Sequence, residues 1–376
     1  MPNKLDTRFL DTLRGFSALM VFVGHSRWLL WEGYAEGYVK HPELYNGIEK
    51  GVVYFLSLFR FGHESVIFFF VLSGFVIHLR YSKKLSFTKQ PVSFDYKDYF
   101  YRRFHRIYPP FIFALVLTYG IDKLGIYNEF SIYSNRTNNI SINTNIHSNH
   151  GFLNLMGNLF FIETEYIRDW GTNSPLWSLK FEWWFYVIYP FIFFLSRKNV
   201  WYPLVLILSL IGVLSLFSNI QIYFFIRLFE YLAIWWFGAI IADVYTKRFQ
   251  LDFFYLSFLS LFIFIAIFCE SYIPTILLKD LLWGLGFSGI VSFLFFLQEK
   301  KISLTVLNKF KILGDFSYTL YICHFPILVF LSGFLMFQNN NYLPKTPFYA
   351  LLIIPFVLAI SYLLYQYIEK PYVSKK

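Results

Sequence analysis

Two ionisable side chains in the first apolar segment have the types and spacing to do chemistry. Arg14 and His25 are eleven residues apart, which on a helix is about three turns, so both lie on nearly one face, roughly 16 Å apart along the axis. Ionisable groups cost a few kcal/mol inside a membrane and therefore indicate function. The pair predicts a pathway with an anion-binding inner end and a proton-accepting outer part. Alternatively, Arg14 reaches lipid headgroups and a neighbouring helix satisfies His25.

A carboxylate is expected at the same depth as His25. Glu182 lies about a turn inside the outer end of the fourth apolar segment, where it could orient an imidazole and raise its basicity. The alternative is a solvated Glu182 paired with Lys180 or Arg168. Glu64 opens the second segment on the same outer side.

Two other polar residues have packing as their simpler interpretation. Ser73 precedes Gly74, and such a small pair permits close helix packing. We favour that role over a nucleophilic serine, because no base is adjacent in sequence. His324 stands near mid-membrane, two residues before Pro326, which is typical of packing at a proline kink.

A basic cluster precedes the third apolar segment. Arg103 and Arg106 are three residues apart and would share a helix face. Pro109 and Pro110 suit the first turn of a helix that begins there. Anchoring on the inner side explains any single arginine, whereas the cluster near Arg14 is suited to phosphate, which guanidinium groups bind well.

The composition defines the elements that must position these residues. Of 376 residues, 57% are hydrophobic and 15% charged, against about a quarter charged in soluble domains. The apolar residues form blocks about as long as a bilayer is thick. We therefore predict an all-α, polytopic transmembrane bundle, with residues 1–376 as one domain. The ten predicted spans are 10–31, 64–80, 107–124, 178–196, 200–218, 222–243, 252–269, 279–297, 315–337 and 347–368.

The charges predict how these spans are oriented. With both termini cytoplasmic, about two thirds of the 33 Lys and Arg residues fall on the inner side, as the positive-inside rule requires. The net charge of +10 is then mainly a topology signal that would attract anionic lipids. No basic domain stands free of the membrane to bind nucleic acid.

The longest polar stretch, 125–177, is predicted as an extracytoplasmic loop. It is rich in Asn, Ser and Thr between 131 and 150, which favours a solvated, mobile loop over a lid on an outward-facing site. Cys269 and Cys323 lie in apolar runs and provide neither a disulfide framework nor metal ligands. We expect no metal.

Six short motifs, spread in order over nearly the whole chain, resemble those of the acyltransferase-3 family of integral membrane O-acyltransferases. They are Arg14 and His25; Phe69–Phe75 with Ser73 and Gly74; Arg102, Arg103, Arg106, Ile107 and Pro109; Trp177, Ser178, Leu179 and Glu182; Ser317, Tyr318, Tyr321, His324 and Pro326; and Glu369 and Pro371. One departure is Trp183, where many members have a second acid. Many members also carry an esterase-like extension, and this chain, ending at Lys376, resembles the stand-alone form.

The resemblance implies transfer of an acyl group, expected to be acetyl, from cytoplasmic acyl-CoA to a hydroxyl of an extracytoplasmic or lipid-linked saccharide in a bacterial inner membrane. His25 would be the general base, and Glu182 or Glu64 would orient it. The residues expected to bind CoA phosphates are Arg14, Arg103 and Arg106, and those expected to contact substrate or support structure are Ser73, Trp177, Tyr318 and His324.

Three alternatives stay open. In a covalent mechanism, His25 or Ser73 would be acylated first. In a proton-coupled small-molecule transporter, Arg14, His25 and Glu182 would form a proton relay, although no internal repeat supports that fold. In a membrane scaffold, the polar core would serve folding alone.

Overall fold

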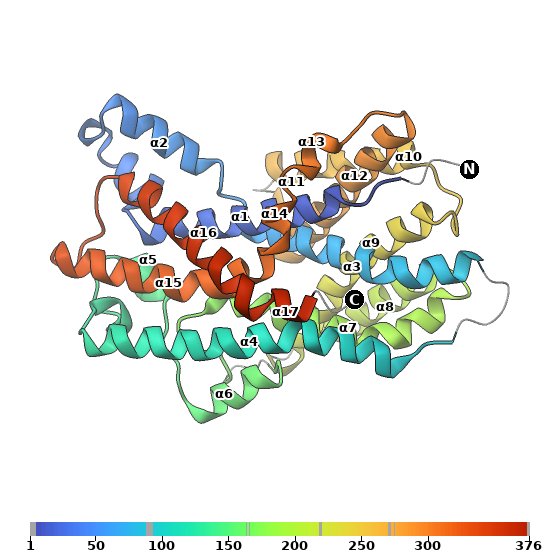
Figure 1. Ribbon diagram of the computed structural model, residues 1–376, viewed down its shortest axis with the longest axis horizontal. Helices are drawn as coiled ribbons and strands as arrows, with labels where there is room; N and C mark the ends of the chain where they lie inside the picture. Colours follow the sequence, from blue (N-terminus) through green and yellow to red (C-terminus); the bar gives the residue numbers. More distant parts are fainter. Residues whose placement is uncertain are drawn as a thin grey trace. The chain divides into compact units, whose positions relative to one another are not determined.

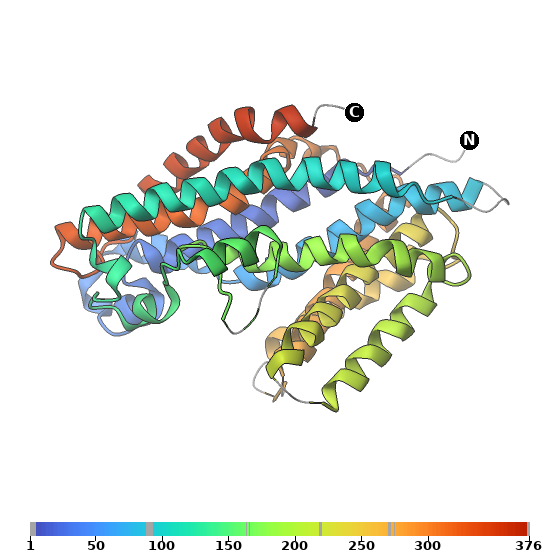
Figure 2. The same ribbon diagram turned by 90° about the horizontal axis from the view of Figure 1, so that it is seen from below.

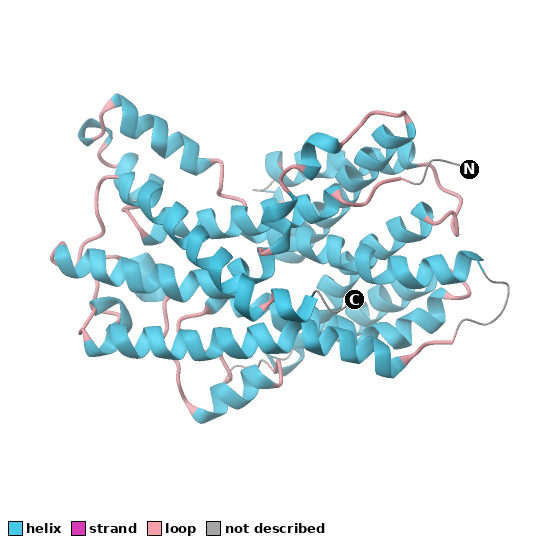
Figure 3. Cartoon of the chain, in the orientation of Figure 1, coloured by secondary structure: helices cyan, strands magenta, loops and turns pink. Residues whose placement is uncertain are grey.

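The computed structural model describes residues 5–87, 93–162, 164, 166–217, 220–269, 272–273 and 275–373. Within these ranges every regular element is a helix, as Figure 3 shows, and the only β-bridge joins Asn149 to Gly171. Four lysines that contribute to the predicted inner charge lie outside the described ranges: Lys4, Lys89, Lys375 and Lys376. The all-helical prediction is confirmed.

A helical segment occupies each of the ten predicted apolar runs. The segments are α1 (Phe9–Leu29), α3 (Gly62–Phe87), α4 (Tyr96–Tyr127), α7 (Trp177–Ser196), α8 (Trp201–Ser215), α9 (Ile220–Tyr245), α10 (Phe253–Ser257) with η5 (Phe258–Ser260) and α11 (Leu261–Phe268), α12 (Ile276–Glu299), α15 (Ser317–Gln338) and α16 (Phe348–Ile368). Among the described residues, six helical stretches are long and apolar enough to cross a membrane: Gly47–Ser86, Tyr96–Tyr127, Tyr223–Tyr245, Ile276–Glu299, Ser317–Gln338 and Phe348–Ile368. The count of ten crossings and the location of the termini remain predictions.

The start of α4 differs from the prediction. This helix begins at Tyr96, and Pro109 and Pro110 lie inside it instead of in its first turn. A proline inside a membrane helix is tolerated where neighbouring groups satisfy the backbone that it frees. The basic residues Arg103 and Arg106 are therefore helical and share a face of α4.

The chain forms two compact units, which are described separately. Unit 1 contains Met1–Arg14, His63–Phe100 and Phe181–Ile312, and unit 2 contains Gly15–Gly62, Tyr101–Lys180 and Leu313–Lys376. The shorter elements are η1 (Tyr34–Tyr38), η2 (Pro42–Leu44), α2 (Gly47–Ser57), η3 (Ser131–Ser134), α5 (Ile140–Asn145), α6 (Phe152–Leu159), η4 (Ser174–Leu176), α13 (Thr305–Asn308), α14 (Lys311–Asp315) and α17 (Lys370–Val373).

In unit 1, α9 packs between α8 and α12, and α10 and α11 also pack on α12 (Figure 2). Small residues bring α3 and α9 together. A Cβ on Gly74 would lie 1.8 Å from the Trp235 carbonyl oxygen, and one on Gly238 would lie 1.9 Å from that of Val71. Because no side chain fits in either place, the two backbones touch directly.

In unit 2, α15 packs against α16 and contacts η3 and η4 (Figure 1). Most of the α15 side chains are buried. One end of α15 is held by Glu369, a buried residue that follows α16. Its carboxylate accepts hydrogen bonds from the backbone N–H of Thr319 at 3.0 Å and from the Thr319 hydroxyl at 2.6 Å, which caps the first turn of the helix.

The polar segment after α4 contains η3, α5 and α6 where the structure describes it, and its mobility and extracytoplasmic location remain predictions. Asp122 of α4 accepts bonds from the backbone N–H and the hydroxyl of Thr172, and lies 3.0 Å from Nε2 of His150. Gly171 has a left-handed φ of +58°, and a Cβ there would lie 2.4 Å from an Asp122 oxygen. Burial, together with the charge of Asp122, raises the pKa of Tyr133, so its phenol stays neutral.

Candidate active site

Two histidines from distant parts of the chain meet in unit 2. Nδ1 of His25, on α1, lies 2.9 Å from Nε2 of His324, on α15. The two ring planes differ by 9° and their centroids are 5.2 Å apart. The nitrogens are much closer than the centroids, so the rings meet edge to edge, which is the geometry of an in-plane hydrogen bond.

The surrounding contacts restrict which nitrogen of each ring can carry a proton. Nδ1 of His324 lies 2.9 Å from the carbonyl oxygen of Leu320, which can only accept, so this nitrogen donates. With His324 neutral, its Nε2 then accepts, and Nδ1 of His25 is the donor to it. Nε2 of His25 is thereby left with a lone pair, and it has no hydrogen-bond partner among the described residues of this unit.

Aromatic rings enclose the imidazole pair. Phe325 meets the His25 ring at 4.8 Å in an edge-to-face arrangement, and Phe22 meets the His324 ring at 5.7 Å in the same way. His324 has no exposed surface, whereas His25 is only partly buried. The environment is thus apolar around the bonded edges of the two rings and leaves part of His25 accessible.

Three motifs of the sequence meet on α15. The hydroxyl of Tyr318 donates to the carbonyl oxygen of Ile107, in the basic motif of α4, at 3.1 Å. One turn further along, the Tyr321 hydroxyl lies 2.6 Å from the Ser178 hydroxyl and donates to the Pro175 carbonyl. Trp177, the other member of that motif, begins α7. These bonds hold α15, and with it His324, in a fixed position within unit 2.

Pro326 leaves the backbone carbonyl of Ile322 without its usual helical donor, and the sequence alone does not predict which residue replaces that donor. Proline has no N–H for the carbonyl four residues earlier, which is that of Ile322. Asn173, just before η4, supplies the missing donor through Nδ2 at 2.9 Å and also donates to Thr118 Oγ1 at 3.1 Å. A proline inside a membrane helix indicates that some neighbouring group donates to the unpaired carbonyl. It does not indicate which residue supplies that donor.

Ser73 and Glu182 meet in unit 1. The Ser73 hydroxyl donates to Oε1 of Glu182 at 3.1 Å and accepts from the indole N–H of Trp235 at 3.2 Å. Tyr186, one turn beyond Glu182, donates to the same carboxylate oxygen. Lys180, offered as an alternative partner of Glu182, instead forms a buried ion pair with Asp169 at 2.8 Å in unit 2.

The other predicted residues lie in the N-terminal parts of their helices. Arg14 pairs with Asp11, one turn earlier on α1, at 3.1 Å. Glu64 lies 3.9 Å from Lys279 in unit 1. Arg103 and Arg106 are partly buried on α4 in unit 2. The predicted action of Glu182 or Glu64 on His25 would join residues of different units and remains a prediction.

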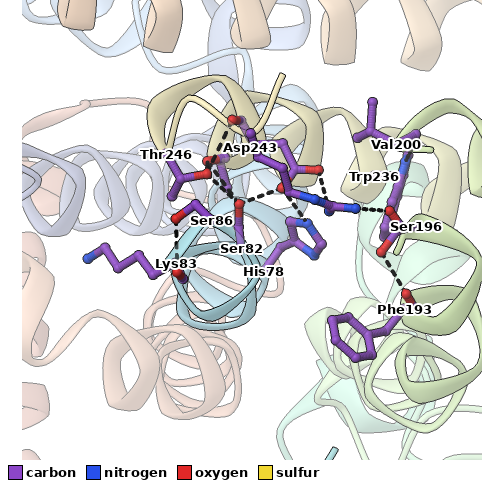
Figure 4. Close-up of polar contacts among 12 residues, drawn as sticks. His78, Ser82, Lys83, Ser86, Phe193, Ser196, Val200, Trp236, Asp243 and Thr246 are labelled. Atoms are coloured by element: carbon purple, nitrogen blue, oxygen red, sulfur yellow. Dashed lines mark hydrogen bonds and ion pairs between the residues drawn. The ribbon is translucent and has the colours of Figure 1, made fainter. Parts of the chain in front are cut away.

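A second buried histidine lies in unit 1 and was not singled out from the sequence. His78 has no exposed surface. Its Nε2 lies 3.0 Å from Asp243 and its Nδ1 lies 3.0 Å from the Tyr189 hydroxyl. Asp243 also accepts from Ser82 at 2.5 Å and from Arg248 at 3.0 Å, and Arg248 donates to the carbonyl of Ser196 (Figure 4). This network joins α3, α7 and α9.

Comparison with known proteins gives the class. A family model described as an acyltransferase domain, that of the acyltransferase-3 family, matches residues 7–366. The chain therefore belongs to the acyltransferase-3 family and is an integral membrane acyltransferase. No curated protein and no solved structure matches it. The resemblance carried by the six motifs is confirmed at the level of the family.

Proposed function

We propose that this protein is a membrane O-acyltransferase that moves an acyl group from cytoplasmic acyl-CoA to a hydroxyl of an extracytoplasmic or lipid-linked saccharide. We expect acetyl-CoA as the donor and a bacterial inner membrane as the location. The observation that carries the proposal is the state of His25. Its Nδ1 lies 2.9 Å from Nε2 of His324, and with His324 neutral its Nε2 holds a lone pair, which is what a general base requires.

The proposed reaction is a direct transfer. Nε2 of His25 accepts the proton of the acceptor hydroxyl while the hydroxyl oxygen forms a bond to the thioester carbon. The carbon–sulfur bond then breaks, and the proton passes from His25 to the departing CoA thiolate. One ester and one free thiol replace one thioester and one hydroxyl, so no further reactant is needed.

The donor's charge gives the basic residues a role. CoA carries phosphates, and guanidinium groups bind phosphate through two donors at once. We assign this role to Arg103 and Arg106, which share a face of α4, and to Arg14, as the sequence predicts. No hydrogen bond or ion pair engages the Arg106 side chain among the described residues of unit 2, so binding phosphate need not break an existing ion pair.

Replacement of the base tests the proposal. We expect His25→Ala to lower transfer of radiolabelled acetyl groups from acetyl-CoA to the glycans of host membranes by roughly 10²–10⁴-fold. Ser26→Ala is the matched control, because Ser26 is the buried neighbour on α1 and, among the described residues, its hydroxyl bonds only the Phe22 carbonyl. Near-normal transfer by the His25 variant would refute the role, and solute uptake without acyl-CoA would favour a transporter.

A second experiment separates direct transfer from a covalent route. Purified protein is incubated with radiolabelled acetyl-CoA in the absence of any acceptor. Direct transfer leaves the protein unlabelled, whereas the covalent route deposits label on His25 or Ser73. Digestion and mass spectrometry of the labelled peptide would identify which side chain carries the acyl group.

A further inference from the structure

The hydrogen bonds of His324 are more specific than packing at a proline kink requires. A residue that packs at a kink needs only the right volume. In addition, Nδ1 of His324 donates to a backbone carbonyl of its own helix, and its Nε2 faces Nδ1 of His25 at 2.9 Å, where a neutral ring presents a lone pair. Because Leu320 lies one turn away on the same helix, the direction of this bond does not depend on any mobile partner.

The alternative proton arrangement on His25 is unfavourable. If His25 carried its proton on Nε2, the lone pair of its Nδ1 would face the lone pair of His324 Nε2 across 2.9 Å. That arrangement loses a hydrogen bond and replaces it with repulsion in an apolar setting, where an unmet polar group is costly. The His324 ring has no exposed surface and is packed against Phe22, so it cannot turn away to relieve the contact.

The same bond helps after the proton has moved. When His25 accepts the hydroxyl proton it becomes an imidazolium, and its Nδ1–H then donates a charge-assisted hydrogen bond to His324, which is stronger than the neutral one. A buried aspartate performs both tasks for the histidine of a Ser-His-Asp triad, holding its tautomer and stabilising its charged form. In this protein a neutral imidazole, itself anchored by a carbonyl, occupies that position.

We propose that His324 is the positioning residue that holds His25 in the tautomer with its proton on Nδ1 and its basic lone pair on Nε2. This inference rests on the proposed function only where it concerns catalysis. The tautomer itself is a property of the resting protein and can be measured without any substrate.

Two amide substitutions separate this role from packing. In His324→Gln the amide oxygen is as many bonds from Cα as Nε2, so it can still accept from His25. In His324→Asn the amide reaches only the position of Nδ1 and leaves His25 without an acceptor. We expect the Gln variant to retain transfer within about tenfold of wild type and the Asn variant to lose roughly 10²-fold or more in kcat, with little change in KM for acetyl-CoA.

The assay uses host membrane vesicles, whose own glycans are the acceptors, and radiolabelled acetyl-CoA. Ser332→Ala, at a buried site on the same helix, is the matched control, and thermal unfolding of each purified variant accounts for loss of folded protein. Equal activity of the Asn and Gln variants at equal stability, whether high or low, would overturn the proposal. An inactive wild type would instead contradict the proposed function.

The tautomer of His25 can also be measured directly in the wild-type protein, which tests the proposal even if the variants fail to fold. Full-length protein labelled with ¹⁵N-histidine gives nitrogen chemical shifts that distinguish a protonated from an unprotonated ring nitrogen. The His25 signals are identified by their absence from His25→Ala. We expect a protonated Nδ1 and an unprotonated Nε2 at neutral pH, and the reverse assignment would overturn the proposal.

Discussion

His25 and His78 both lie against aromatic rings, but their hydrogen bonds differ. Both nitrogens of His78 are engaged, one by a carboxylate and one by a phenol, and Arg248 balances the charge of that carboxylate. His25 uses one nitrogen, its partner is another imidazole, and its other nitrogen has no hydrogen-bond partner among the described residues of unit 2. A histidine whose two nitrogens are satisfied holds helices together, whereas one with a single open nitrogen is available for proton transfer.

The two regions also differ in what a mutation should change. The network of His78 joins three helices through a charged centre, so its loss should appear as lost stability. The His25–His324 pair joins two helices through one neutral bond, and hydrogen bonds between membrane helices contribute only about 0.6 kcal/mol on average. Its loss should appear mainly as lost activity.

The largest expected effect on stability is that of Asp243→Ala. Removing the carboxylate leaves Arg248 without its buried counter-charge and His78 without an acceptor. Breaking a buried pair in this way costs about 3–5 kcal/mol. Unfolding in detergent, followed by circular dichroism, measures the loss. A variant as stable as wild type would show that the network contributes little to the fold.

Replacing each histidine in turn by alanine tests the comparison between the two sites directly. We expect His78→Ala to cost about 1.5–3 kcal/mol of stability, because it removes a bond to a charged group, while its folded fraction retains transfer. His25→Ala should cost less than about 1 kcal/mol and lose transfer. Both variants are measured for unfolding and for activity per folded molecule. Parallel losses in the two variants would remove the distinction between the sites.

The smallest expected effect on stability and activity taken together is that of Asn173→Ala. It removes the donor to Ile322 and leaves that carbonyl unmet beside Pro326. We expect a loss of about 1 kcal/mol, with a modest fall in activity because α15 carries His324. The thermal midpoint and kcat are compared with those of Thr144→Ala, at an exposed position of α5, where no change is expected.

The sequence predicts which segments are helical, but it does not predict which helices contact one another. Apolar runs of bilayer length identify every long helix, because lipid leaves the backbone no other way to satisfy its polar groups. The same reasoning placed the start of α4 at Pro109, because hydropathy does not detect a helix that continues into a polar stretch such as Tyr96–Arg106.

The candidate site was predictable in its members but not in its pairings. The spacing of Arg14 and His25 correctly predicts that both lie on one helix, because both belong to the same apolar segment. Nothing in the spacing links His25 to His324, because α1 and α15 are separated by almost 300 residues and their contact depends on tertiary packing. For the same reason His78 passed unnoticed, as its partner Asp243 lies on another helix of unit 1.

The bond between Asn173 and the carbonyl of Ile322 has a consequence for how this chain can vary. The carbonyl of Ile322 needs a donor from position 173 only while Pro326 withholds the amide that would otherwise serve that oxygen. Were Pro326 replaced by an ordinary residue, the helix would satisfy its own oxygen and selection on position 173 would relax. Positions 173 and 326 should therefore covary among descendants of this sequence, because the residue at one position determines which residues are tolerated at the other.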